Sequence, residues 1–158
     1  MRWNEIGEVR CSVARALSVV GDRWTLLLLR DLFLGARRFE HFEASLGASP
    51  HLLSTRLRKL VDHGIVERRP YQEKPVRHEY RLTAKGRDLY PVMVGLVGWG
   101  DRWMSDEHGP PVTFEHKTCG HSTHPELHCS ECGEPLRAQD VRAHLSVSAP
   151  VAPTERTS

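Results

Sequence analysis

The chain has 158 residues, of which 39% are hydrophobic and 27% charged. This length suits one ordinary domain with an appendage, and no run of ~18 apolar residues is present that could span a membrane. The N-terminal residues lack an apolar signal segment, so we expect a cytoplasmic protein. The net charge of +2 is unevenly spread, because residues 10–90 carry 16 Lys and Arg against 9 Asp and Glu. A basic excess of this kind suits a phosphate-bearing partner such as nucleic acid.

Three helices are predicted in the first part of the chain. Residues 11–20 are apolar at helical spacing and predict a first helix, which ends at Gly21 and Asp22. Residues 24–34 predict a strongly apolar, deeply buried helix that ends at Gly35. A third helix is predicted over residues 39–46, with its inward face formed by Phe39, Phe42 and Leu46.

A fourth predicted helix begins at Pro50, and Ser49 is its expected N-cap. At 100° per residue, the leucines of this helix fall on one side and predict a core face. The opposite side is polar and contains no large apolar residue. The third helix, a turn with Gly47 and this helix form a predicted helix-turn-helix pair. The core leucines are Leu53, Leu57 and Leu60, and the polar side contains His51, Ser54, Thr55, Arg58 and Asp62.

Residues 65–69 and 78–82 alternate apolar and charged side chains and predict two antiparallel strands, joined by a Pro-containing loop. A polar helix followed by a basic hairpin suits a DNA groove. Arg56 lies nearer the core side of its helix, so we expect it to form an ion pair or a flanking contact. The predicted base contacts are His51, Ser54, Thr55 and Arg58, and the predicted backbone or minor-groove contacts are Arg37, Arg38, Lys59, Arg68, Arg69, Lys74 and Arg77.

A long helix is predicted over residues 84–104, capped by Thr83 and kinked or split near Tyr90 and Pro91. Together with the first helix, its apolar stripe is interpreted as a homodimer interface. Packing within one chain is the alternative interpretation. The stripe consists of Val92, Leu96, Trp99 and Trp103.

The predicted fold is mainly α-helical with a small antiparallel β-wing, a winged helix-turn-helix, followed by a small zinc-ribbon-like module. We place the DNA-binding and dimerisation domain at residues 1–104, a linker at 105–111 and a zinc-binding module at 112–142. Residues 143–158 are rich in Pro, Ser and Thr, which predicts a disordered tail.

The zinc prediction rests on two chelating pairs, His116 with Cys119 and Cys129 with Cys132, each with a two-residue gap. Glycines follow both pairs, and three thiolates with one imidazole form a closed tetrahedral set that suits structural Zn²⁺. A segment with few apolar residues would obtain its folding energy from the metal. A ribbon that has lost its metal is the alternative. The fourth ligand is also open, with His121, His124 and His128 as alternatives to His116.

These pieces resemble the HxlR-type family of bacterial transcriptional regulators. The matching pieces, in order, are Cys11 followed by ARAL, then GDRWTLLLLRDLFLGARRF, SPHLLSTRLRKLVDHGIVERR, EYRLTAKGRDL and WGDRW. The resemblance implies a homodimeric winged-helix regulator that binds a roughly palindromic operator and represses or activates genes, often neighbouring ones. It also places Cys11 where several members carry a redox- or electrophile-sensing cysteine. Arg10 and Arg15 could stabilise a thiolate there, although a small core residue is the alternative role.

We therefore predict a homodimeric, sequence-specific regulator that binds double-stranded DNA and carries a structural zinc appendage. An alternative is a sensor-regulator that responds to zinc or to thiol oxidation. A zinc enzyme is disfavoured, because three cysteines and a histidine leave no open coordination position for a reaction assisted by Glu115 or Glu131. Sequence motifs of other enzyme classes are not found.

Overall fold

The structure is a computed structural model that describes residues 3–8 and 10–144. Most of the predicted tail at 143–158 therefore lies outside the described residues. The chain divides into two compact units, of which the first extends to Arg87 and the second spans Asp88–Ala143. The elements in chain order are η1 (Trp3–Glu8), α1 (Ser12–Val20), α2 (Arg23–Phe33), α3 (Phe39–Leu46), α4 (Pro50–Asp62), β1 (Val66–Glu73), β2 (Val76–Leu82), α5 (Ala84–Arg87), α6 (Tyr90–Met104), β3 (Phe114–His116), β4 (His121–Thr123) and η2 (Ala138–Asp140).

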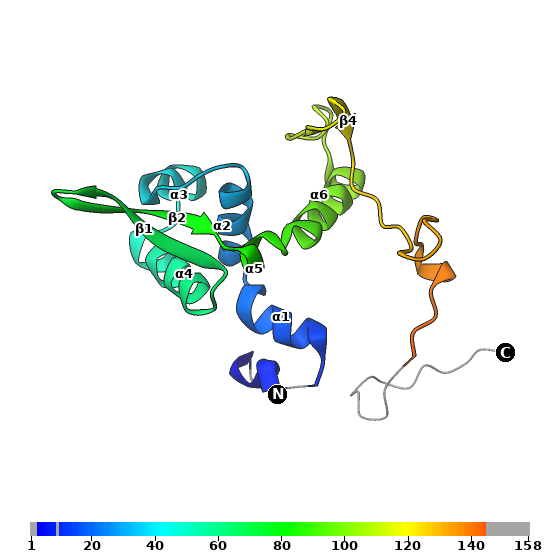
Figure 1. The fold of residues 1–158 in the computed structure, drawn as a ribbon, viewed down its shortest axis with the longest axis horizontal. Helices are drawn as coiled ribbons and strands as arrows, with labels where there is room; N and C mark the ends of the chain where they lie inside the picture. The colour runs from blue at the N-terminus through cyan, green and yellow to red at the C-terminus, as the bar shows by residue number, and fades with distance from the viewer. Residues whose placement is uncertain (1–2, 9, 145–158) are drawn as a thin grey trace. The chain divides into compact units, whose positions relative to one another are not determined.

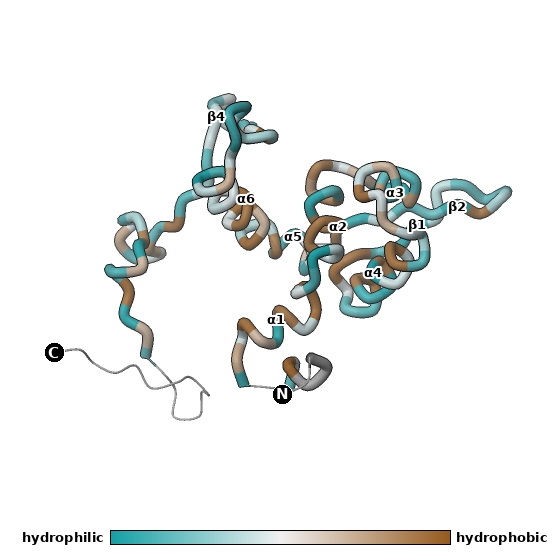
Figure 2. The backbone as a smooth tube through the Cα atoms, turned by 180° about the vertical axis from the view of Figure 1, so that it is seen from behind, coloured by the Kyte–Doolittle hydropathy of each residue, from teal (hydrophilic) through white to brown (hydrophobic). Residues whose placement is uncertain are grey.

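The core of the first unit is formed by α2, α3 and α4 together with the base of the β-ribbon. As predicted, α2 is deeply buried, and most of its tube has the brown of apolar residues in Figure 2. Burial of each large aliphatic or aromatic side chain contributes about 1.5–3 kcal/mol. The side chains that are almost completely buried include Leu28, Leu29 and Leu32 of α2, Phe42 of α3, Leu53, Leu57 and Leu60 of α4, and Val66 of β1.

The turn between α3 and α4 follows the predicted helix-turn-helix pattern. Gly47 ends α3 with a φ of +58°, a left-handed conformation that glycine adopts without steric cost. The Ser49 hydroxyl accepts a hydrogen bond from the Leu52 N–H, and Pro50 occupies the first turn of α4. The start of α4 is therefore set by local sequence, as predicted.

The β-ribbon is the wing, and its strands are longer than the predicted segments 65–69 and 78–82. β1 and β2 pair antiparallel from Val66 opposite Leu82 to Glu73 opposite Val76, with an irregularity after Pro70. Proline has no N–H for a ladder, but an irregular edge strand tolerates it. The first predicted strand ended too early and the second began two residues too late, because Pro70 and the residues after it were assigned to the loop. In Figure 1 the ribbon extends well beyond α3 and α4.

The long helix predicted over residues 84–104 is split into two helices, which is one of the two alternatives, kinked or split, that the sequence predicted. α5 ends at Arg87, and α6 begins at Tyr90 with Pro91 in its first turn. The Thr83 hydroxyl accepts the Gly86 N–H at 3.1 Å, which confirms the predicted cap. The structure groups α6 with the C-terminal segment, whereas the sequence suggested a boundary after residue 104. The predicted domain boundaries stay a prediction.

In the second unit, β3 and β4 form a short antiparallel hairpin in which His116 lies opposite His121. Beyond α6, none of the described residues 105–144 is buried. This segment therefore has regular local structure without a hydrophobic core. In the part of the chain that the structure describes, no helix has the length and apolar content needed to cross a membrane.

Candidate nucleic-acid interface

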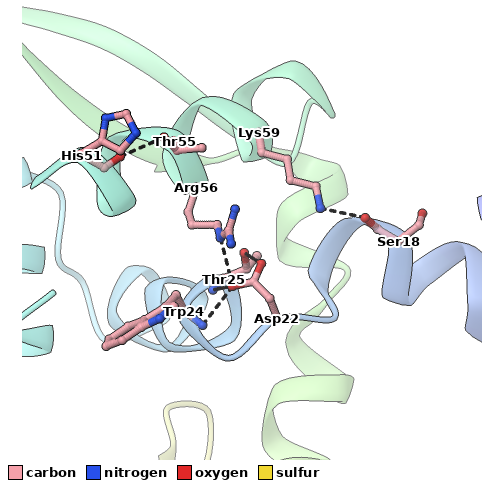
Figure 3. Close-up of polar contacts among 8 residues, drawn as sticks. All are labelled: Ser18, Asp22, Trp24, Thr25, His51, Thr55, Arg56 and Lys59. Carbon is pink, nitrogen blue, oxygen red and sulfur yellow. Dashed lines mark hydrogen bonds and ion pairs between the residues drawn. The ribbon is translucent and has the colours of Figure 1, made fainter. Parts of the chain in front are cut away.

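The outer face of α4 is free to contact a ligand. His51, Ser54, Thr55 and Arg58 are exposed, whereas the leucines of the opposite face are buried. The Thr55 hydroxyl donates to the His51 carbonyl at 2.9 Å (Figure 3), which leaves its oxygen able to accept. Among the described residues, the Arg58 guanidinium has no protein partner. The structure thus brings the four predicted base-contacting residues together on one exposed face.

Arg56 turns the other way and anchors α4 to the start of α2. Its Nε lies 3.1 Å from Oδ1 of Asp22, which confirms the expected ion pair (Figure 3). Asp22 is also the N-cap of α2, because Oδ1 accepts the N–H groups of Trp24 and Thr25 at 3.1 Å each. The hydroxyl of Thr25, which is completely buried, donates to Oδ2 of Asp22 at 2.6 Å.

These contacts change the acidity of Asp22. Burial raises the pKa of this carboxyl group, but the hydrogen bonds from Thr25 together with the charge and hydrogen bond of Arg56 outweigh the effect of burial. The pKa of Asp22 consequently lies below its usual value. From the sequence, Asp22 was expected only to end the first helix. An Asp followed three residues later by Thr at a helix start was the available sign of a cap.

Lys59, predicted as a phosphate contact, has a partner within the protein. Its ammonium group donates to the Ser18 carbonyl at 2.7 Å (Figure 3). Ser18 lies in the last turn of α1, where carbonyl groups have no partner within the helix and favour a cation. Lys59 and Arg56 therefore hold α4 against α1 and α2. A DNA contact by Lys59 stays a prediction.

The basic residues of the wing fall into two groups. Arg68 lies 3.0 Å from Nδ1 of His78, and Arg69 forms an ion pair with Glu67 at 2.7 Å. Lys74 and Arg77, near the tip, are exposed, and among the described residues the Lys74 ammonium and the Arg77 guanidinium have no partner. The tip therefore carries the cations that are most available to phosphate.

Arg37 and Arg38 are attached to the wing by backbone contacts. The Tyr80 N–H donates to the Arg37 carbonyl at 2.7 Å, and Arg38 forms a bridge with Glu79 of β2. The Arg38 guanidinium lies 4.6 Å from the centre of the Tyr71 ring, at cation–π distance. Phosphate contacts by these two arginines, as expected from the sequence, stay a prediction.

Two further predicted sites lie outside this surface. Cys11 immediately precedes α1, is half-buried and is not in a disulfide. The first chelating pair is close together, with His116 Nδ1 3.3 Å from Cys119 Sγ. In the second pair, the N–H groups of Cys132 and Glu131 lower the pKa of the Cys129 thiol by hydrogen bonding. Across residues 3–8 and 10–144, no three potential metal ligands meet at one point.

Comparison with known proteins supports the interpretation of the helix-turn-helix. A model of the HxlR-like helix-turn-helix family matches residues 19–108. An uncharacterized HTH-type transcriptional regulator of Mycobacterium tuberculosis is 49% identical over 130 residues, which cover 82% of this chain and 82% of the relative. Another HTH-type regulator, from Synechocystis, is 38% identical over 104 residues, 65% of this chain and 76% of its own length.

Solved structures agree with this comparison. PA1607, provisionally assigned as a transcription factor, has a TM-score of 0.78 at 36% identity and covers 89% of this chain and 98% of its own. The redox regulator HypR in its reduced form has a TM-score of 0.56 at 32% identity and covers 58% of this chain and 92% of its own. These relatives are transcription regulators rather than enzymes. Because the family model matches more than half of the sequence, the chain belongs to the HxlR-like helix-turn-helix family of transcriptional regulators.

Proposed function

We propose that the protein binds an operator in double-stranded DNA as a homodimer, with α4 in the major groove and the wing against the backbone. The observation that carries this proposal is that two cations of α4 are paired within the protein, whereas the third is exposed and unpaired among the described residues. Arg56 and Lys59 are held by Asp22 and Ser18, whereas Arg58 is exposed on the same face as His51, Ser54 and Thr55.

This arrangement suits base recognition, because the helix is fixed by one set of side chains and the groove is contacted by another. A guanidinium can donate two hydrogen bonds to the O6 and N7 of guanine, and hydroxyl groups can donate or accept. The free cations at the wing tip, Lys74 and Arg77, would lie against phosphate, which positions the protein without reading sequence. We place this operator binding in the cytoplasm, where bacterial DNA lies.

The homodimer is supported by the exposed apolar face of α6. Trp99 and Trp103 are 60% and 66% exposed, and Val92 and Leu96 lie on the same helical face. α1 also exposes Val13. Apolar surface of this extent on neighbouring turns indicates a protein interface. A two-fold dimer would present two copies of α4 to two half-sites one helical turn apart.

The test is a binding titration with the promoter region of the protein's own gene and with unrelated duplex DNA. Arg58→Ala should weaken binding to the specific site by about 1–3 kcal/mol and reduce discrimination between bases at one position. Arg142→Ala removes an equal charge far along the sequence from the helix-turn-helix and is the matched control. Unchanged specific binding by a folded Arg58→Ala protein would contradict the proposed orientation of α4.

A second candidate function is thiol-redox sensing through Cys11. It is favoured by the similarity to the redox regulator HypR, at 32% identity. It is further supported by the half-buried position of Cys11, which limits but does not block access to the thiol. This function would act on the same DNA-binding activity and is compatible with the first proposal.

A further inference from the structure

The C-terminal segment contains two tight turns of the same geometry, and the DNA interface uses neither. In the first, the Gly120 N–H donates to the His116 carbonyl at 2.7 Å. In the second, the Gly133 N–H donates to the Cys129 carbonyl at 2.9 Å. Both glycines have a positive φ, +69° and +76°, which residues with a Cβ rarely adopt. Each turn therefore places two potential metal ligands, separated by two residues, around one bend.

The first turn spaces its two ligand atoms suitably for zinc. Nδ1 of His116 and Sγ of Cys119 lie 3.3 Å apart. Zinc–nitrogen and zinc–sulfur bonds at a tetrahedral angle require about 3.6 Å between these two atoms. A shift of a few tenths of an ångström would allow both atoms to bind one ion. β3 and β4 hold this turn from both sides, because they end at His116 and begin at His121.

The second turn places both of its cysteines at the edge of one open hollow. Cys129 and Cys132 line the same hollow, which has a volume of about 510 Å³. A small hairpin supports this turn, because the Cys129 N–H donates to the Glu134 carbonyl at 2.8 Å and the Leu136 N–H donates to the Leu127 carbonyl at 2.7 Å.

Hydrophobic burial does not account for the stability of this segment. None of the described residues 105–144 is buried, although the segment contains β3, β4 and both turns. Segments of this size without a core usually require a metal or disulfides to fold. The three cysteines of this segment are thiols in the structure, and the thiolate form of cysteine is a preferred ligand of zinc.

We propose that His116, Cys119, Cys129 and Cys132 of one chain bind one Zn²⁺ ion as a closed structural site. The two pairs do not meet in this structure, where the described residues contain no group of three or more potential ligands. Nine residues separate Cys119 from Cys129 and could extend over about 30 Å, so the chain allows the pairs to close on one ion.

The position of His116 beside Cys119 favours it as the fourth ligand. Nδ1 of His128 lies 2.9 Å from the Gly133 carbonyl, and its Nε2 lies 3.3 Å from Glu126. Nε2 of His124 lies 3.1 Å from the same carboxylate. Among the described residues, no such contact is found for Nδ1 of His124 or for the ring of His121, so these two histidines compete with His116, whereas both ring nitrogens of His128 are engaged. His116 is preferred because its Nδ1 already lies 3.3 Å from the Cys119 sulfur. Three thiolates and an imidazole complete a tetrahedral shell without a water position, so the ion has a structural role.

The experiment measures zinc in the purified full chain by mass spectrometry of the metal. We expect about one zinc per chain. Serine in place of Cys119, Cys129 or Cys132 should lower the zinc affinity by more than the ~10-fold typical of an outer-shell change. Cys11→Ser is the matched control and should retain a full equivalent. His116→Ala should lose the metal, and His121→Ala should keep it.

Two outcomes would overturn the proposal. One is the absence of zinc from protein that was purified with added zinc and without a chelator. The other is a ratio of one zinc to two chains, because that ratio requires ligands from both copies. As a measurement that does not depend on variants, a chelating dye should withdraw one equivalent of zinc from the unmodified chain. DNA binding is assayed separately. The Arg58→Ala protein should keep its zinc while it loses affinity for DNA, so the zinc proposal and the proposed function can fail independently.

Discussion

Replacement of Asp22 by asparagine tests how the recognition helix is held. Asp22 accepts two N–H groups and the Thr25 hydroxyl, and its carboxylate pairs with Arg56. Asparagine keeps an acceptor oxygen but loses the negative charge. Hydrogen bonds to a charged group are worth about 1 kcal/mol more than neutral ones. The ion pair is partly exposed, with 30% and 26% of the two side chains accessible, so it adds only about 0.5 kcal/mol.

We therefore expect Asp22→Asn to lower the free energy of unfolding by about 1–2 kcal/mol at pH 7. Asp22→Ala should cost about 2–4 kcal/mol, because it also removes the cap and leaves the buried Thr25 hydroxyl without an acceptor. Urea denaturation measures both values from the shift in midpoint at constant slope. Asp62→Asn, an exposed carboxylate at the end of α4, is the matched control and should change stability by less than about 0.5 kcal/mol.

The effect of Asp22→Asn also depends on pH in a defined direction. The folded protein lowers the pKa of Asp22, so the carboxylate contributes its full stabilisation above the unfolded pKa of about 3.9. This contribution is lost as the pH falls through the folded pKa. The difference between wild type and Asp22→Asn should thus be constant from about pH 5 to 8 and shrink below about pH 4. Equal urea midpoints at pH 7, or an alanine variant no weaker than the asparagine variant, would refute this account of the anchor.

Three further results are expected. Alanine at both Lys74 and Arg77 should weaken binding to specific and unrelated duplexes alike and lower the salt slope by about 2, and an unchanged slope in an anisotropy titration would remove the wing tip from the interface. Trp99→Glu places a charge on the exposed face of α6 and should shift the protein from dimer to monomer in sedimentation experiments; an equally stable dimer would place the interface elsewhere. A mild thiol oxidant should alter the operator affinity of the wild type but not of Cys11→Ser, and equal responses would exclude Cys11 as the sensor.

Local chemistry made the helical part of this protein predictable. Ser49 and Pro50 define the start of α4, Gly47 ends α3, and the spacing of Leu53, Leu57 and Leu60 assigns the core face. Each of these signals acts within one or two helical turns, so a single sequence contains them in full. The wing was predicted less well, because strand length depends on a partner strand, and Pro70 is tolerated only through the local irregularity of that pairing.

The sequence by itself thus determined the winged helix-turn-helix and the exposed face of α4, because helical periodicity and caps are local properties. Metal binding by the two Cys and His pairs stays a prediction. The helical position of Arg56 indicated an ion pair, but only the tertiary structure decided its partner and showed that Lys59 is also held within the protein. Asp22 and Ser18 are 34 and 41 residues from their partners Arg56 and Lys59, and no local pattern encodes a contact over that separation. Arg58 differs from Arg56 and Lys59 for the same reason, because its guanidinium has no partner among the described residues of the folded protein. A side chain that has no partner within the protein remains available to DNA.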